Sequence, residues 1–137
     1  MNVYIPTVIE VVEYDPEWPD GFEGLRGEYA AAMAAAAVPV VAIEHVGSTS
    51  VPGLAAKPVI DCDIVVEEHD VAGASAALVG LGFQPDGDLG IPMRWAFKEP
   101  ARLARTNTYV IVAGSLSLRN HLAVRDTLRA SPVLRQQ

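Results

Sequence analysis

The sequence predicts one α+β (mixed α/β) domain that spans residues 1–137, and two observations lead to this fold class. The first is size, because 137 residues of which 50% are hydrophobic can bury one core of ordinary dimensions. The second is order, because stretches rich in β-branched residues alternate along the chain with stretches of helical periodicity. No internal repeat, low-complexity tract or linker divides the chain, so we expect a single domain.

The N-terminal part is predicted to form a strand followed by a helix. Residues 8–14 alternate β-branched side chains with glutamates, which is typical of a half-buried strand. A helix is expected to begin at Asp15, whose carboxylate can accept from free backbone amides, with Pro16 in the first turn, and to end before Pro39. Its core-facing stripe follows steps of three or four residues and consists of Trp18, Phe22, Leu25, Tyr29, Met33 and Ala36.

Two buried strands are expected next, at residues 40–46 and 58–66, because both stretches are apolar and β-branched. The first strand runs into a loop of small residues at 47–50. The second strand is unusual, since Asp61 and Asp63 interrupt an otherwise hydrophobic run.

The second half of the chain is predicted to add two helices and two strands. These elements are a helix at 67–80, a loop at 85–92, strands at 94–98 and 109–112, and a helix at 114–129. Ser115 or Ser117 is expected to cap the last helix, and Pro132 is expected to disturb its end.

The charge distribution along the chain is uneven. The net charge of −7 argues against broad, sequence-independent binding of nucleic acid, which requires a basic surface. Residues 1–93 carry two basic and 15 acidic side chains and residues 94–137 carry eight basic and two acidic, so the two parts stand at −13 and +6. Opposed fields of this kind suit a site where a cation and a polyanion meet, or they form solvated faces that pair with each other.

The sequence predicts a cytoplasmic protein with no membrane partner. No stretch reaches the roughly 18 to 20 consecutive apolar residues that a membrane span needs. The N-terminus lacks a basic start and a small-residue cleavage site, and the single Cys62 cannot form an intrachain disulfide. Relatives are expected to continue the last helix beyond Arg135-Gln136-Gln137, and the sequence does not decide between a natural and a truncated C-terminus.

Asp61 and Asp63 are the most informative residues for function. Residues two apart on a strand project from the same face, so their carboxylates are expected to lie close together. Two neighbouring carboxylates repel each other, and a Mg²⁺ ion removes that cost while it keeps waters and substrate phosphates as further ligands. The alternative is a strand end where the aspartates cap neighbouring amides at a solvated rim.

The loop before this strand strengthens the metal interpretation. Gly47 and Ser48 follow an apolar strand and stand 12 residues before Asp61. A glycine lets the backbone approach a phosphate closely, and a serine adds a hydroxyl donor beside exposed amides. Alone, a Gly-Ser pair after a strand is most often a simple turn. Combined with the Asp-x-Asp strand, the spacing favours a site for a metal-bound polyphosphate.

The segment at 45–61, which reads HVGSTSVPGLAAKPVID, resembles the signature of the GrpB family, which belongs to the nucleotidyltransferase superfamily. Further stretches resemble the family at Tyr14-Asp15-Pro16, Trp18-Pro19, Phe22, Gly90-Ile91-Pro92, Arg94, Phe97-Lys98, Arg105-Thr106, His121-Leu122-Ala123, Arg125-Asp126 and Leu128-Arg129. The resemblance implies a nucleotidyltransferase-like fold with a mixed β-sheet flanked by helices. It also implies that Gly47, Ser48 and Thr49 contact nucleotide phosphates and that the paired aspartates bind Mg²⁺.

The chain departs from this pattern at a third acidic position. Active members of the superfamily add a carboxylate on a neighbouring strand, which should correspond to the strand at 108–112, and this strand has no acid. Relatives in the GrpB family resemble one another there in a histidine-rich run, where this chain has Asn107, Thr108, Tyr109 and Val110. Glu44 is the one alternative acid. Two aspartates can still hold one Mg²⁺ through a nucleotide, so we expect a site that binds better than it reacts.

Basic side chains are the expected phosphate ligands, with a solvated surface as the alternative for each. They are Lys57, Arg94, Lys98 and Arg105. His121 and Arg125 lie four residues apart on the last helix, so they share a face and either reach one anion or form a surface pair. His45 is a candidate general base or a histidine satisfied by backbone groups, and Cys62 is expected to face the core.

Three functions are compatible with these features. The first is a Mg²⁺-dependent nucleotidyltransferase, or a derivative of one, that binds a nucleoside triphosphate or another phosphorylated small molecule. The second is a non-catalytic folding or stability accessory, such as the GrpB-like domain fused to dephospho-CoA kinase. The third is a nucleotide or anion sensor that has lost catalysis.

Overall fold

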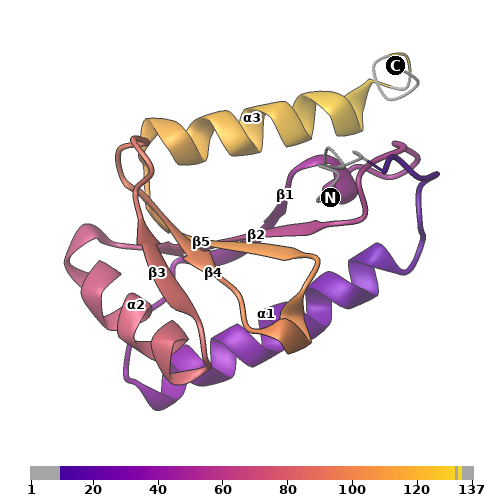
Figure 1. Ribbon diagram of the computed structural model, residues 1–137. Coiled ribbons are helices and arrows are strands. Elements are labelled where there is room, and N and C mark those ends of the chain that lie inside the picture. The colour runs from indigo at the N-terminus through magenta and orange to yellow at the C-terminus, as the bar shows by residue number, and fades with distance from the viewer. Residues whose placement is uncertain (1–9, 132, 134–137) are drawn as a thin grey trace, which may run out of the picture.

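The protein is built on a five-stranded mixed β-sheet with the strand order β1-β2-β5-β4-β3 (Figure 1). The computed structural model describes residues 10–131 and 133. The strands are β1 (Ala42–Val46), β2 (Ile60–Val66), β3 (Gln84–Gly87), β4 (Arg94–Lys98) and β5 (Thr106–Val112). β2 and β5 pair in parallel at the centre, and the other neighbouring strands pair antiparallel.

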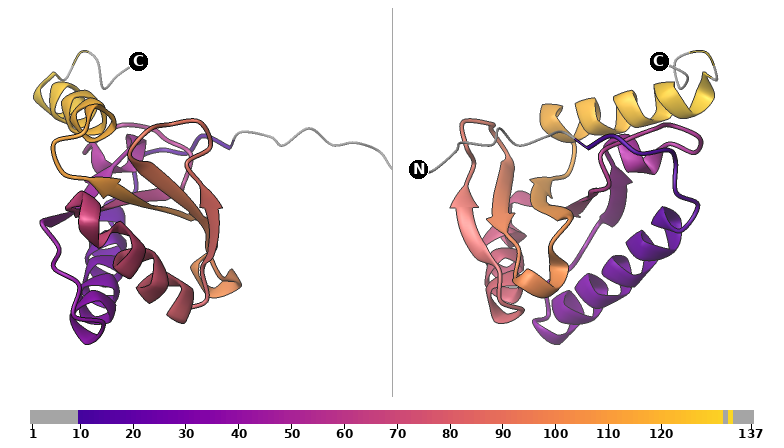
Figure 2. Two further views of the ribbon diagram at one scale, coloured as in Figure 1. Left: turned by 90° about the vertical axis from the view of Figure 1, so that its left-hand side faces the viewer. Right: turned by 45° about the vertical axis from the view of Figure 1, so that its right-hand side comes forward.

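Helices cover both faces of this sheet, which confirms the predicted fold class. They are α1 (Trp18–Ala35), α2 (Val71–Gly80) and α3 (Leu116–Ala130). Figures 1 and 2 show α1 and α2 together on one face and α3 alone on the other. None of the helices in the described part of the chain is long and apolar enough to cross a membrane.

The alternation of side chains along β2 divides the two faces chemically. Cys62, Ile64 and Val66 are buried in the main core with residues of α1 and α2. Val65 instead packs with Leu118 of α3, on the opposite face. Because successive side chains of a strand point to opposite faces, Asp61 and Asp63 lie on the α3 face with Val65. The sequence therefore places its charged pair beneath the last helix.

The predicted stripe of α1 is confirmed at five of its six positions. Trp18, Phe22, Leu25, Tyr29 and Met33 are all buried. Ala36 is exposed, so its assignment to the core was wrong. The helix ends at Ala35, so Ala36 lies in the turn that follows it, next to Ala37 with its positive φ of 56°. At the other end, the helix begins at Trp18 with Glu17 as its N-cap, three residues later than predicted, and no side chain caps it. Asp15 Oδ1 instead accepts from the Glu17 amide at 2.8 Å in the turn before the helix.

Three strand predictions need correction. In residues 8–14, of which 8 and 9 lie outside the described residues, only Val12 forms a bridge, an isolated one to Ala56. The strand predicted at 40–46 is shorter, and its first three residues are only half-buried because β1 lies at one edge of the sheet. The loop predicted at 85–92 begins with β3, which is fully exposed and pairs with β4 at the other edge.

The remaining elements agree with the predictions at most positions. β4 has the predicted bounds, and β5 begins three residues earlier than expected. A 3₁₀ turn precedes α2 within the predicted helix. Ser115 caps α3, since its hydroxyl accepts from the Leu118 amide at 3.2 Å, whereas the Ser117 hydroxyl donates to Pro92 O. The effect predicted for Pro132 lies outside the described residues.

Candidate functional site

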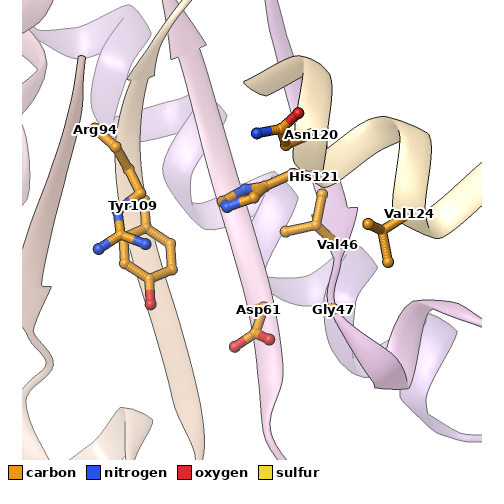
Figure 3. A pocket seen from close by; sticks show the side chains of 8 residues that line it. All are labelled: Val46, Gly47, Asp61, Arg94, Tyr109, Asn120, His121 and Val124. Carbon is orange, nitrogen blue, oxygen red and sulfur yellow. The ribbon is translucent and has the colours of Figure 1, made fainter. Parts of the chain in front are cut away.

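A pocket of about 260 Å³ lies over the acidic end of β2, between the sheet and α3 (Figure 3). Its lining comes from β1, β2, β4, β5, the turn after β1, and α3, and consists of Val46, Gly47, Asp61, Arg94, Tyr109, Asn120, His121 and Val124. Four residues predicted for the site therefore meet in one cavity. They are Gly47, Asp61, Arg94 and His121.

The two aspartates lie on one face of β2, as predicted, but at different depths. Asp61 lines the pocket and is half-buried. Burial raises the pKa of Asp61, and the nearby charge of Asp63 raises it further. Asp63 is completely buried one step further along the strand, where its Oδ2 contacts Nδ1 of His121 at 2.7 Å. This hydrogen bond is the main cause that raises the pKa of His121.

The second oxygen of Asp63 has no hydrogen-bond partner. Oδ1 is buried, and no donor among the described residues reaches it. A buried carboxylate oxygen without a partner is costly, and such atoms in native structures call for an explanation such as an ion or a water. Asp63 thus offers one oxygen on the side of the sheet that also carries Asp61.

Gly47 brings the turn after β1 into contact with Asp61. Its backbone has φ 74° and ψ −176°, a conformation that is essentially restricted to glycine. A Cβ at this position would lie 2.1 Å from Asp61 Oδ2. The glycine is therefore required both by its conformation and by the approach of the acid. Ser48 follows at the exposed start of the 3₁₀ turn Ser48–Ser50.

Thr49, which was expected to contact phosphates, and His45, a candidate general base or structural histidine, both lie outside the lining of the pocket. The Thr49 hydroxyl is buried and donates to Val59 O at 3.0 Å, so the His45 Nε2 donates to Thr49 at 2.9 Å. The His45 ring stacks on Phe22 with centroids 4.8 Å apart. Burial and, secondarily, two arginines of α3 lower the pKa of His45 to about 4. This neutral histidine supports the turn from the α1 side and does not face Asp61.

Of the four basic residues predicted to bind phosphate, only Arg94 lines this pocket. The guanidinium of Arg94 lies 4.5 Å from the centre of the Tyr109 ring, and its buried Nε has no hydrogen-bond partner. Lys57, Lys98 and Arg105 are exposed and do not line the pocket. Lys57 is near enough for its charge to lower the pKa of Asp61 and so acts on the site at longer range.

His121 and Arg125 share a face of α3, as predicted, but they reach different acids. His121 contacts Asp63, whereas Arg125 forms an ion pair with Glu44 of β1 and also donates to His45 O at 3.3 Å. Glu44 lies opposite Asp63 in the β1–β2 pair, and therefore on the same face. Because Arg125 holds its carboxylate, Glu44 does not join the two aspartates as a third acid.

Asn107 lies on the neighbouring strand directly beside Asp61, where an acidic side chain would form a third carboxylate. It lies opposite Asp61 in the β2–β5 pair, and its Nδ2 donates to Asp61 Oδ1 at 2.9 Å. Tyr109, two residues on, lies opposite Asp63, while Thr108 points to the other face and contacts the Tyr29 hydroxyl. The third acidic position was predicted within 108–112, and Asn107 was named only as the start of the run that departs from the family. The alternation of the strand could have singled out Asn107, had its start been known.

The two aspartates fit a hard cation that takes its remaining ligands from water or from a bound phosphate. Among the described residues, no three histidine, cysteine, aspartate or glutamate side chains form a group that could hold a metal ion. Asp61 and the unpartnered Oδ1 of Asp63 supply two carboxylates. Mg²⁺ is typically bound by one or two carboxylates together with waters and substrate phosphates.

The five-stranded mixed sheet, with helices on both of its faces, has a nucleotidyltransferase-like fold. The structure of the Cid1 poly(U) polymerase aligns with a TM-score of 0.59 over 91% of this chain and 39% of Cid1, at 12% identity, which shows the fold alone. The sequence profile described as GrpB protein matches residues 8–137, and the chain belongs to the GrpB family. The crystal structure of conserved protein GrpB from Enterococcus faecalis aligns with a TM-score of 0.77, at 30% identity over 93% of this chain and 76% of that one.

Curated relatives of the chain are longer proteins. The UPF0157 protein YqkA of Bacillus subtilis is 29% identical over 132 residues, which are 96% of this chain and 38% of YqkA. The UPF0157 protein PA4798 of Pseudomonas aeruginosa is 48% identical over 77 residues, which are 56% of this chain and 31% of PA4798. The chain therefore spans about a third of the length of these two relatives.

Proposed function

We propose that the pocket binds a nucleoside triphosphate together with one Mg²⁺ ion held by Asp61 and Asp63. The observation that carries this proposal is the buried, unpartnered Oδ1 of Asp63 on the face that also presents Asp61 to the pocket. When bound, the cation would neutralise phosphate charge and draw the polyphosphate towards the two acids. We place this function in the cytoplasm, in keeping with the unpaired Cys62.

The surroundings of the two acids support a polyphosphate ligand. Arg94 supplies a planar cation whose position is set by the Tyr109 ring beneath it. Gly47 lets the backbone of the turn lie directly beside the Asp61 carboxylate, since a Cβ there would clash with it. A structure of Cid1, with which this chain shares a fold, is described as MgGTP-bound, which is consistent with the same ligand class here.

The same geometry argues for binding without efficient nucleotidyl transfer. Asn107 presents an amide donor to Asp61 where a third carboxylate would add an acceptor. Two-metal transfer needs enough ligands for the ion that activates the attacking oxygen, and the described residues supply two carboxylates. We therefore assign the site a binding function, with turnover slow or absent.

Calorimetry tests this proposal. The chain is titrated with ATP, GTP, UTP and CTP, each with Mg²⁺ or Mn²⁺, and again with the cation chelated. We expect cation-dependent binding of at least one nucleotide, lost in Asp61→Asn and retained in the matched control Asp86→Asn on exposed β3. No heat with any nucleotide in either cation rejects the proposal. Pyrophosphate release under the same conditions measures any transfer.

The amide at Asn107 also favours a second function, a non-catalytic accessory role towards a protein such as dephospho-CoA kinase. A domain of this kind does not need the third acid. The double variant Asp61→Asn with Asp63→Asn separates the two functions when the chain is co-expressed with the kinase. The accessory role predicts that the chain changes the yield of soluble kinase and that the double variant does so as well as the wild type. The nucleotide role predicts that the double variant loses nucleotide binding and that neither form of the chain changes the kinase yield.

A further inference from the structure

His121 is fixed in place before any ligand arrives. The Ser115 cap and the buried Leu118 anchor the first turn of α3 on the sheet, and His121 follows Leu118 by three residues on the same face. Its Nδ1 contacts Asp63 Oδ2 at 2.7 Å, and its ring meets the edge of the Tyr109 ring with centroids 6.3 Å apart. The imidazole is thus held between a carboxylate and an aromatic ring.

This contact leaves the two oxygens of Asp63 in different states. Oδ2 is held by His121, whereas Oδ1 is buried without a partner. We propose that His121 is a positioning residue that holds Asp63 by Oδ2, so that Oδ1 is the oxygen offered to the cation. This inference rests on the proposed cation site. It gives His121 a different role from that of a phosphate ligand.

The physical basis is the support of a metal ligand by a hydrogen bond from behind. Carboxylates that bind metal ions are commonly fixed by a neighbouring donor, and loss of that donor typically costs about 10-fold to 100-fold in metal affinity. Asp63 is 0% exposed, so no bulk water can replace His121 as the donor to Oδ2. Without the imidazole, Asp63 has two unpartnered oxygens and no fixed orientation towards Asp61.

A competing role for His121 predicts the opposite change in cation affinity when the imidazole is removed. If the basic ring merely occupied the place of the cation on Asp63, its removal would leave an open carboxylate and strengthen cation binding. If it positions Asp63, its removal weakens cation binding although a basic group is lost next to two acids. The sign of the change in affinity therefore distinguishes the two roles.

The test measures Mn²⁺ affinity of the full chain by electron paramagnetic resonance of the free ion. The matched pair is His121→Gln, which keeps an N–H donor, and His121→Met, which has similar length and none. We expect His121→Met to weaken Mn²⁺ binding by about 10-fold to 100-fold and His121→Gln to stay within about threefold of wild type. Arg119→Gln, which removes a positive charge from an exposed position of α3, is the control and should leave the affinity unchanged.

Each outcome has a separate meaning. Equal or tighter Mn²⁺ binding by a folded His121→Met overturns the inference and leaves the cation site intact. Absence of Mn²⁺ binding by the wild type instead overturns the proposed function and the inference with it. If His121→Met fails to fold, nitrogen NMR of the wild-type His121 ring with and without Mg²⁺ decides. Retention of the Nδ1–H hydrogen bond in saturating Mg²⁺ is expected, and its loss overturns the inference.

Discussion

Asn107 and Asp61 lie opposite each other in the parallel β2–β5 pair, and the Asn107 amide donates to Asp61 Oδ1 at 2.9 Å. A neutral donor therefore stands where a carboxylate would complete a three-acid site. This contact favours the ionised form of Asp61 when no cation is bound. Burial raises the pKa of Asp61, and the hydrogen bond from Asn107 lowers it.

The first prediction concerns the replacement Asn107→Asp. The variant loses the hydrogen bond and gains a like charge next to Asp61, so we expect the cation-free protein to lose about 1–2 kcal/mol of unfolding free energy. Millimolar Mn²⁺ should raise the melting temperature of Asn107→Asp by more than it raises the melting temperature of the wild type, because the third acid adds a ligand. Asn107→Ser is the control. A Mn²⁺ shift no larger than in wild type contradicts this assignment of Asn107.

The second prediction is that Gly47→Ala destabilises the protein by about 2–3 kcal/mol or more. The new Cβ meets Asp61 Oδ2 and the backbone conformation disfavours any side chain. Gly53→Ala is the matched control, because Gly53 also has a positive φ, of 84°, but no atom within 4 Å of the added Cβ. Urea unfolding of both variants isolates the clash. Equal losses for the two alanines would show that Asp61 does not press on the turn.

The third prediction follows from the pKa of His45. Its value of about 4 in the folded state lies below about 6.5 in the unfolded chain, so the unfolded chain binds the proton first as the pH falls. The stability that His45 contributes is complete above pH 6.5 and declines towards pH 4, by up to about 3 kcal/mol. Urea unfolding from pH 8 to pH 4 should show a smaller decline for His45→Gln. Parallel curves would contradict a buried neutral His45.

The fourth prediction separates the two arginines that the sequence analysis grouped as nucleotide ligands. Arg125 is occupied by Glu44, so Arg125→Gln should cost about 1–2 kcal/mol of unfolding free energy and change nucleotide affinity less than threefold. Arg94→Gln should lower nucleotide affinity about 10-fold, the amount expected for one charge-assisted hydrogen bond to phosphate. Urea unfolding and calorimetry measure both quantities. An equal loss of affinity in the two variants would place Arg125 in the site.

The features of the site that could be predicted from the sequence depend on short-range geometry. Asp61 and Asp63 share a face because the side-chain period of a strand is two, whatever the strand packs against. The Gly47 turn was predicted because glycine is the residue that tolerates close backbone approach. The stripe of α1 was predicted down to Met33 because it is regular over four turns.

What could not be predicted depends on how elements meet. The register of β1 decides that Glu44 and not His45 shares the face of Asp63, and an edge strand with half-buried residues gives little signal for that choice. The way α3 lies across the sheet decides that His121 reaches Asp63 while Arg125 reaches Glu44. β3 escaped prediction because its sequence, Gln-Pro-Asp-Gly, has a turn composition and is a strand only through its pairing with β4.

The most direct test of the cation and nucleotide site is anomalous diffraction from crystals grown with Mn²⁺ and a non-hydrolysable nucleoside triphosphate. We predict one strong anomalous peak between Asp61 and Oδ1 of Asp63, with the triphosphate in the pocket beside Arg94. A well-ordered nucleotide bound elsewhere, or a pocket without a peak at saturating Mn²⁺, would contradict the account.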